Sequence, residues 1–269
     1  MLGSIVGDIV GSIYEFANIK TKDFEFFQPE MERTDDSILC IATADWLLHG
    51  GDVSHYYSRY ALEYPYPMGG YGGMFKAWSS KVARQGIHEP YNSCGNGSAM
   101  RIAPVGWAFE TEREVLEAAK VSASCTHNHP EGIKGAQATA LCIFLARQGH
   151  TASDIRARIE RDFGYDLSMS VEELQRRYSW QGIDRKGDGG ICQDSVPQAI
   201  ICALQAKDFE DAIRNAISIG GDSDTIGCIA GGIAEALYGI PESIKERAWK
   251  YLDETEGRTV RSFIQKYSI

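Results

Sequence analysis

The stretch GSIVGDIVGSIYEF, residues 3–16, determines much of the fold around it. At about 100° of rotation per residue along a helix, its polar side chains fall within one narrow arc, formed by Ser4, Asp8, Ser12 and Glu15. Beside this arc lies a row of small residues, Gly3, Gly7 and Gly11. The rest of the circumference is apolar, so the pattern predicts a helix that is buried on most sides, with its acidic side chains largely desolvated.

The acidic residues of this helix indicate a bound cation, and its glycines indicate a closely packed second segment. Buried carboxylates are costly unless they are paired or bind a cation, so Asp8 and Glu15 indicate a cation site. Glycines four residues apart leave one edge of the helix without side chains, which allows a second backbone to approach closely. Taken alone, the segment is also compatible with a polar stripe that faces solvent beside a tight helix contact.

Apolar residues at helical spacing recur along the rest of the chain, whereas alternating strand patterns are nearly absent. Helices are expected over 38–48, 115–124, 136–146, 155–163, 196–204, 212–219 and 244–252. Two pairs with capping-box spacing and two prolines typical of first helical turns mark helix starts: Thr111 with Glu114, Ser170 with Glu173, Pro130 and Pro241. We therefore expect an all-α fold, a compact and irregular helical bundle formed by a single domain over residues 1–269.

The composition limits the partners and the compartment of the protein. A formal net charge of −10 argues against general nucleic-acid binding, which needs clustered lysine and arginine. The segment from Met1 to Phe16 has no basic start and contains two acids, so we expect neither a signal peptide nor a membrane span. The seven cysteines lack C-x-x-C spacing, which predicts buried free thiols rather than zinc ligands or disulfides. We expect a cytoplasmic protein.

Two acidic clusters have the composition of metal sites. Thr34-Asp35-Asp36-Ser37 places four oxygen-bearing side chains at the start of the helix expected over 38–48, and oxygen ligands suit Mg²⁺ or Mn²⁺. Acids there would also complement the helix dipole, and this simpler explanation stays open. In Gly220-Gly221-Asp222-Ser223-Asp224-Thr225, the glycines permit unusual backbone angles and the two aspartates could bridge two ions. A plain helix cap is the alternative for this second cluster.

A glycine-rich segment, Ser93-Cys94-Gly95-Asn96-Gly97-Ser98, precedes another apolar stretch. Backbone amides converge at such a helix start, so we expect it to bind phosphate, although it lacks the Gly-Lys-Ser/Thr ending of a P-loop.

His127 and His129 are too few to form a zinc site. They could hydrogen-bond a phosphate or a ribose hydroxyl, or serve only the structure. The Gly- and Pro-rich loop 64–73 either carries function or merely joins helices.

Five motifs in a fixed order carry a resemblance to a known family: Gly7-Asp8-x-x-Gly11-Ser12-x-x-Glu15, Thr34-Asp35-Asp36-Ser37, Gly95-Asn96-Gly97-Ser98-Ala99-Met100-Arg101, Thr126-His127 and Gly220-Gly221-Asp222-Ser223-Asp224-Thr225. Together they resemble the ADP-ribosylglycohydrolase family, which includes dinitrogenase reductase-activating glycohydrolases and ADP-ribosyl-acceptor hydrolases. The resemblance extends from Leu2 to about Ile240. Ser37 departs from it, since many relatives have threonine there, but the hydroxyl is retained.

The resemblance implies an all-helical fold with two divalent metal ions, Mg or Mn, at the floor of a cleft. By similarity, the ligands of these ions would be Thr34, Asp35, Asp36, Asp222, Asp224 and Thr225. The residues that would contact the substrate are Gly95, Asn96, Gly97, Ser98, Met100 and His127, with Ser195 and Val196 at the nucleotide end.

The implied reaction is hydrolysis of the bond between ribose C1 of ADP-ribose and an acceptor on a protein or a small molecule. Our hypothesis is that the metal ions hold the ribose and activate water. Glu15 would be the general acid or base, and Asp36 is the second candidate for this role. The sequence position of Glu15 resembles that of the glutamate in hydrolases of serine-linked ADP-ribose. Arginine-directed relatives are also similar to this sequence, so the acceptor linkage stays open. The alternatives are a binuclear metal phosphoesterase, which usually recruits several histidines, and a non-catalytic homologue that binds ADP-ribose.

Overall fold

A computed structural model describes residues 1–269, which form helices joined by loops, with two isolated β-bridges and no strand. The expected all-α fold is therefore confirmed. The α-helices are α1 (Leu2–Gly11), α2 (Asp35–His49), α3 (Val53–Glu63), α4 (Gly73–Gln85), α5 (Gly97–Met100), α6 (Ala103–Ala108), α7 (Glu112–Ser124), α8 (Pro130–Arg147), α9 (Ala152–Phe163), α10 (Val171–Arg177), α11 (Cys192–Leu204), α12 (Phe209–Ser218), α13 (Ser223–Tyr238), α14 (Glu242–Ala248) and α15 (Glu254–Tyr267). Three 3₁₀ turns, η1 (Ser12–Tyr14), η2 (Ile183–Arg185) and η3 (Trp249–Tyr251), complete the elements.

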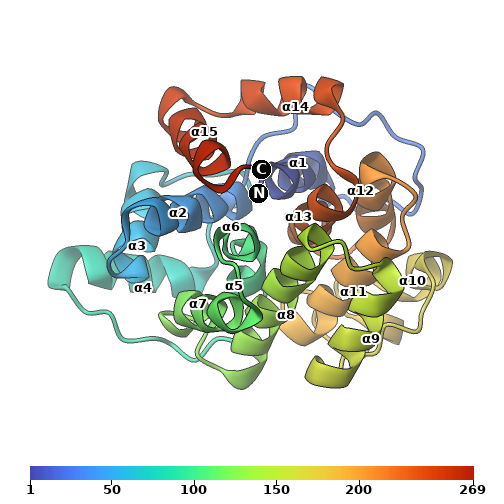
Figure 1. Cartoon of the computed structure of the whole chain (residues 1–269), viewed down its shortest axis with the longest axis horizontal. Helices are drawn as coiled ribbons and strands as arrows, with labels where there is room; N and C mark the ends of the chain where they lie inside the picture. Colours follow the sequence, from blue (N-terminus) through green and yellow to red (C-terminus); the bar gives the residue numbers. More distant parts are fainter.

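Helices α1 and α13 lie in the middle of the arrangement, and the other helices surround them (Figure 1). Helices α2, α3 and α4 lie on one side, α11 and α12 on the other, and α14 and α15 cover one end (Figure 1). Ile5 and Ile9 of α1 and Ile229 and Ile233 of α13 belong to one continuous hydrophobic core that also includes residues of the outer helices. Burial of this apolar surface is the main stabilising contribution to the fold.

The contact between α1 and α13 brings the two backbones together at glycine positions. A Cβ atom on Gly7 would lie 1.9 Å from the carbonyl oxygen of Gly227, and one on Gly3 would lie 2.3 Å from that of Gly231. A Cβ atom on Gly11 would lie 2.5 Å from the Cα atom of Asp224. The close approach expected from the row of glycines is therefore observed. Its third contact places the end of α1 against an acidic residue of the second cluster.

The first helix is shorter than the sequence predicts. It ends at Gly11 and continues as the 3₁₀ turn η1 rather than as α-helix to Phe16. The Oγ atom of Ser12 donates a hydrogen bond to the carbonyl oxygen of Ile9 at 2.8 Å, a local bond that competes with the regular helical pattern. Glu15 follows directly after this turn, with helical backbone angles of its own.

The predicted helix starts agree with the structure in part. Pro130 occupies the first turn of α8, and Ser170 forms a reciprocal capping box with Glu173. Thr111 caps α7, but its hydroxyl bonds to the Glu114 carboxylate, so the reciprocal bond to the Thr111 amide is missing. Pro241 precedes α14 with extended backbone (ψ 138°), so it lies one residue before the first turn rather than within it.

Two further expectations concern the cysteines and the length of the helices. All seven cysteines are free, and five of them are buried, as expected for structural thiols. None of the helices combines the length and the apolar character that crossing a bilayer requires.

The glycine contact can be tested by adding one methyl group. We expect Gly7→Ala to lower the free energy of unfolding by about 3 kcal/mol or more, because the methyl group meets backbone atoms of α13 that are fixed by the core. The measurement is urea unfolding followed by far-ultraviolet circular dichroism. Gly257→Ala is the matched control, since its Cβ atom would meet only the end of the flexible Arg261 side chain, 3.3 Å away. Equal effects of the two substitutions would contradict this account of the contact.

Candidate active site

A cavity of about 560 Å³ opens where residues from all five motifs meet, with Glu15 contributed by the first motif. Its walls come from segments far apart in the chain: the end of η1, the start of α2, the loop before α4, the segment leading into α5, the turn before α8 and the start of α13. The acidic residues on its wall are Glu15, Asp35, Asp36, Asp222 and Asp224. This convergence makes the cavity the candidate active site.

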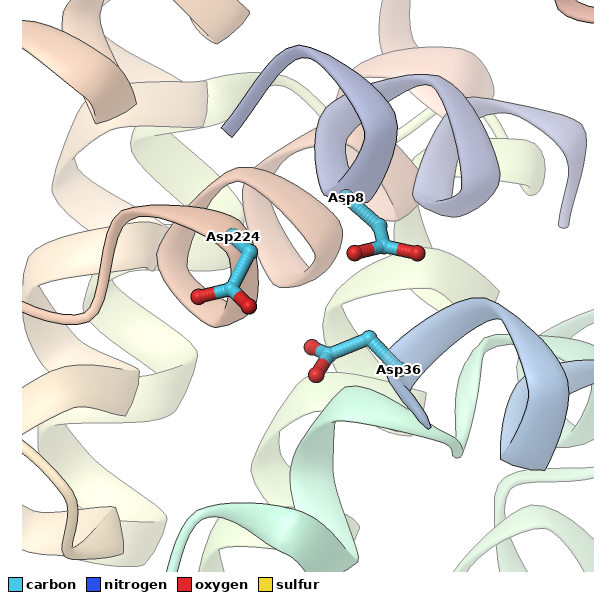
Figure 2. A group of neighbouring side chains, drawn as sticks. All are labelled: Asp8, Asp36 and Asp224. Atoms are coloured by element: carbon cyan, nitrogen blue, oxygen red, sulfur yellow. The ribbon is translucent and has the colours of Figure 1, made fainter. Parts of the chain in front are cut away.

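Three carboxylates from three different helices meet beside this cavity. Oxygen atoms of Asp8, Asp36 and Asp224 all lie within 4.8 Å of one another. Figure 2 shows the three side chains pointing toward one another from α1, α2 and α13. A second group with the same spacing consists of Glu15, Asp222 and Asp224. Because Asp224 belongs to both groups, the two potential cation sites are adjacent.

Burial and mutual repulsion raise the pKa values of these carboxyl groups. The pKa values of Asp36 and Asp224 lie well above the usual range, first because of desolvation and then because of neighbouring carboxylates. Desolvation also raises the pKa values of Asp8 and Asp222. Desolvation, followed by the charges of Asp222 and Asp8, raises the pKa of Glu15 to about 7. Burial and neighbouring carboxylates, rather than basic side chains, are the main causes of these higher pKa values.

The chemistry of this cluster fits hard divalent cations. The Oδ1 atom of Asp36 is buried and has no hydrogen-bond partner, which is costly for a carboxylate unless a cation satisfies it. The donor atoms that converge here are carboxylate and hydroxyl oxygens, the ligands preferred by Mg²⁺ and Mn²⁺. The residues present therefore fit divalent cations.

Asp8 organises the first turn of α2. Its carboxylate accepts hydrogen bonds from the amides of Thr34 at 3.0 Å and Ser37 at 3.1 Å, and from the hydroxyl groups of both residues. Thr34 Oγ1 in turn accepts a hydrogen bond from the Asp36 amide at 3.2 Å. Four donors therefore hold the Asp8 carboxylate. The polar arc of residues 3–16 indicated a cation site at Asp8 and Glu15, but Asp8 is not among the ligands that the family resemblance implied.

Short hydrogen bonds join the acidic segments to one another and to the glycine-rich segment. Thr225 Oγ1 donates to Asp36 Oδ2 at 3.3 Å, and the Thr225 amide donates to Asp224 Oδ1 at 3.0 Å. Asn96 Nδ2 donates to Asp222 Oδ2 at 2.7 Å. The two acidic clusters and the expected phosphate-binding segment thus form one connected structure.

Two of the expected metal ligands occupy different positions from the rest. Asp35 lies on the cavity wall and is partly exposed, but its carboxylate is outside both groups of three. Desolvation, and then the charges of Asp8 and Asp222, raise its pKa well above the usual range. Thr34 is fully buried behind the wall, where its hydroxyl donates to Asp8 Oδ1 at 2.6 Å.

The glycine-rich segment reaches the cavity through its backbone. Gly95, Asn96, Gly97 and Met100 line the cavity together with His127. A Cβ atom on Gly97 would lie 3.1 Å from His127 Nε2, so a side chain there would crowd the histidine. Ser98 is not on the wall: it is fully buried, and its hydroxyl donates to the carbonyl oxygen of Gly132 at 2.7 Å.

Ser195 and Val196 do not reach the cavity, contrary to expectation. Both are fully buried in α11, and Ser195 Oγ donates back to the carbonyl oxygen of Ile191 at 2.8 Å. A Cγ2 atom of Val196 lies 3.3 Å from where a Cβ atom on Gly135 would be, so this side of α11 packs against α8. Gly190, just before α11, is the residue of this region that lines the cavity.

Sequence reasoning left several wall residues unassigned. Residues 69–75, at the end of the loop that joins α3 to α4, form one wall. A Cβ atom on Gly69 would lie 2.7 Å from Glu15 Oε2, and its positive φ of 74° favours glycine. Tyr91 and Arg101 also line the cavity. The Gly- and Pro-rich composition of the loop was the signal for the first wall, but nothing in the sequence identified its contact with Glu15.

Comparison with known proteins decides the family. The sequence profile of ADP-ribosylglycohydrolases matches residues 1–267. The chain belongs to the ADP-ribosylglycohydrolase family. Human ADP-ribosylhydrolase ARH3 is 29% identical over 95% of this glycohydrolase and 89% of its own length. An ADP-ribosylarginine hydrolase of Pseudomonas putida is 26% identical, over 93% and 73% respectively.

A solved structure supports the same fold. An ADP-ribosylglycohydrolase-related protein complex contains a chain that superimposes with a TM-score of 0.69 at 24% identity, covering 98% of this glycohydrolase and 95% of that chain. Family membership makes the protein an ADP-ribosyl glycohydrolase, an enzyme that hydrolyses the glycosidic bond between ADP-ribose and its acceptor.

The raised pKa values predict how pH affects the metal-free glycohydrolase. Because the pKa of Glu15 rises from 4.5 to about 7 and those of the aspartates also rise, the folded state binds protons more tightly than the unfolded state. The resulting stability is present below the ordinary carboxyl pKa and is lost as pH rises through about 7. We expect the Tm of EDTA-treated protein to fall between about pH 5 and about pH 8, and Mg²⁺ or Mn²⁺ to restore it most at the higher pH.

Two variants separate this cluster from the other acids of the protein. Asp224→Asn should weaken both the pH dependence and the stabilisation by cations, because Asp224 belongs to both groups. Glu30→Gln, at an exposed position, should leave both as in the wild type. A cation effect that persists in Asp224→Asn would count against the site.

Proposed function

We propose that this glycohydrolase binds two divalent cations, Mg²⁺ or Mn²⁺, and uses them to hold ADP-ribose for hydrolysis. The single observation that supports this is the meeting of two carboxylate groups that share Asp224 beside a glycine-rich segment. Asp36, Asp224 and Thr225 would contribute to the first ion, and Asp222 with Asp224 to the second. Asp35 on the cavity wall would complete the ligands from the side of the substrate, while Thr34 and Asp8 hold the first turn of α2.

The carboxylates of the cavity suit the charge that develops during the reaction. Cleavage at ribose C1 passes through a state with positive charge on the sugar ring, which nearby anionic side chains stabilise. When bound, the divalent ions would orient ribose hydroxyls and favour ionisation of water. Glu15 would transfer a proton at the reacting centre, because its carboxylate lies on the cavity wall beside Asp222 and Asp224. Asp36 is the reserve candidate for this role.

The glycine-rich side of the cavity would hold the diphosphate. Gly95, Asn96 and Gly97 line the cavity. The amides of Gly95 and Asn96 already donate to Ser93 Oγ and to the carbonyl oxygen of Gly190, so the Gly97 amide, the first of α5, would be the backbone donor to the phosphate. Met100 and His127 complete this wall. Because Asn96 also bonds to Asp222, the diphosphate and ribose positions would be held at a constant separation.

The substrate would be an ADP-ribosylated protein or a small-molecule conjugate of ADP-ribose. The names of the relatives point to both a general ADP-ribosylhydrolase and an arginine-directed one, so arginine and serine linkages are both to be tested. The net charge of −10 disfavours nucleic acid as a partner. Free cysteines suit a reducing compartment, which supports the cytoplasm as the location.

Product analysis is the direct test of this function. The wild-type protein is incubated with arginine-linked and serine-linked ADP-ribosyl peptides, with Mg²⁺ or with EDTA, and the products are separated by chromatography. We expect intact ADP-ribose from at least one linkage, and loss of the product in EDTA. Formation of AMP would instead identify a metal phosphoesterase. Absence of any product, combined with ADP-ribose binding in calorimetry, would identify a non-catalytic homologue.

The role of Glu15 can be separated from metal binding. We expect Glu15→Gln to slow turnover by about 10² to 10⁴-fold, the usual contribution of a general acid or base. Cation binding, measured by calorimetry, should change little. The structure places the Glu15 carboxylate near Asp222 and Asp224, so clearly weakened cation binding would mean that Glu15 is a ligand instead. Glu30→Gln serves as the exposed control.

A further inference from the structure

His127 presents one edge of its ring to the cavity. The side chain is only 6% exposed and lines the cavity. Its Nε2 atom lies 3.1 Å and 3.5 Å from the positions that Cβ atoms on Gly97 and Gly95 would occupy. The ring of Tyr91 packs edge-on against it, with centroids 5.7 Å apart. Nε2 is therefore the ring nitrogen that can meet a ligand at the glycine-rich segment.

The other ring nitrogen contacts the preceding residue. His127 Nδ1 lies 2.8 Å from Thr126 Oγ1, and both side chains are buried. Which of the two atoms donates depends on the tautomer of the histidine. The groups that contact the Thr126 hydroxyl therefore influence which ring nitrogen of His127 carries the proton.

A buried arginine contacts the same hydroxyl. Arg101 is fully buried, and its Nη2 atom donates to Thr126 Oγ1 at 2.7 Å and to the carbonyl oxygen of Ser122 at 3.0 Å. Its guanidinium lies over the ring of Tyr57, 3.9 Å from the centroid. The Nε and Nη1 atoms have no hydrogen-bond partner, and no carboxylate forms an ion pair with it. Burying an unpaired cation is costly, so this contact requires a functional explanation.

The charge of Arg101 favours one direction for the bond between Thr126 and the histidine. A threonine hydroxyl has one hydrogen atom and two lone pairs, whereas an arginine nitrogen can only donate. Arg101 occupies one lone pair of Thr126, which leaves the hydroxyl hydrogen and the second lone pair for His127. Because the guanidinium is positive, it favours the arrangement in which the Nδ1 lone pair, rather than an N–H group, is directed toward it, so Nδ1 accepts the hydroxyl hydrogen. With Nδ1 as the acceptor, a neutral imidazole carries its proton on Nε2.

We propose that Arg101 and Thr126 are positioning residues that hold His127 as the Nε2–H tautomer, so that its ring donates a hydrogen bond to an oxyanion at the Gly95–Gly97 segment. Under the proposed function, on which the identity of the ligand rests, this oxyanion is the diphosphate of ADP-ribose. Burial, and then the charge of Arg101, lower the pKa of His127 well below its usual value, so the ring stays neutral and the tautomer is the state that matters. The histidine then acts as a fixed neutral donor.

Nitrogen NMR of the metal-free protein without ligand tests the tautomer directly. We expect the wild type to show the proton of His127 on Nε2, and Thr126→Ser, which keeps the hydroxyl, to show the same. Thr126→Val has nearly the same shape but no hydroxyl, so Nδ1 should lose its donor and a population with the proton on Nδ1 should emerge. A wild-type spectrum with the proton on Nδ1 overturns the proposal, whether or not the valine variant folds. An unchanged tautomer in a folded Thr126→Val variant overturns it as well.

Calorimetry with ADP-ribose tests the consequence for binding. We expect Thr126→Val to weaken binding about tenfold, the usual effect of losing a well-oriented hydrogen bond to a charged group, and Thr126→Ser to bind nearly as the wild type. In turnover measurements, KM should rise more than kcat falls, because the donor contacts the diphosphate rather than ribose C1. If the wild type fails to bind ADP-ribose while the Nε2–H tautomer is observed, the proposed function fails and the positioning role stands. Equal affinities for the valine and serine variants would instead refute the link from tautomer to binding.

Discussion

The backbone contact between α1 and α13 is the constraint on which the site depends. The glycines at this contact remove every side chain that would separate the two helices, so the carbonyl groups of one helix lie against the Cα atoms of the other. Asp8 and Asp224 extend from these same helices, and their separation is therefore set by the packing of rigid backbones rather than by flexible side chains. The first turn of α2 is then fixed by its hydrogen bonds to Asp8. A binding site built on such contacts is preorganised before any ligand arrives.

The same construction has an electrostatic cost. Several buried carboxylates with raised pKa values face one another, and no basic side chain compensates them. The large apolar core around α1 and α13 offsets this repulsion and keeps the carboxylates close. This repulsion lowers stability locally, as is common at functional sites. Arg101 is a buried group of opposite charge: a cation without an ion-pair partner that donates a hydrogen bond to Thr126, next to His127.

Much of the fold and part of the site could be predicted from the sequence. The glycine row in residues 3–11 indicated a close helix contact, and helical spacing indicated the all-α class, because both depend on local periodicity. Of the four aspartates predicted as ligands, Asp36 and Asp222 each lie close to Asp224, in two different groups of carboxylates. Ser195 and Val196 lie away from the cavity, since sequence does not reveal which side of α11 faces it. The contacts of Asp8 with α2 and of Gly69 with Glu15 join distant segments, which no local pattern encodes.

The positions of α1 and α13 in the chain have a consequence for how the protein folds. Their paired residues are separated by more than two hundred others, for example Gly7 and Gly227. During synthesis from the N-terminus, the first helix leaves the ribosome long before α13 exists, so the edge that carries its glycines stays uncovered until α13 has been made. Closing so long a loop is entropically slow, so this central contact forms late. The nascent chain therefore passes through a prolonged phase in which chaperones would find an exposed apolar helix carrying a row of glycines.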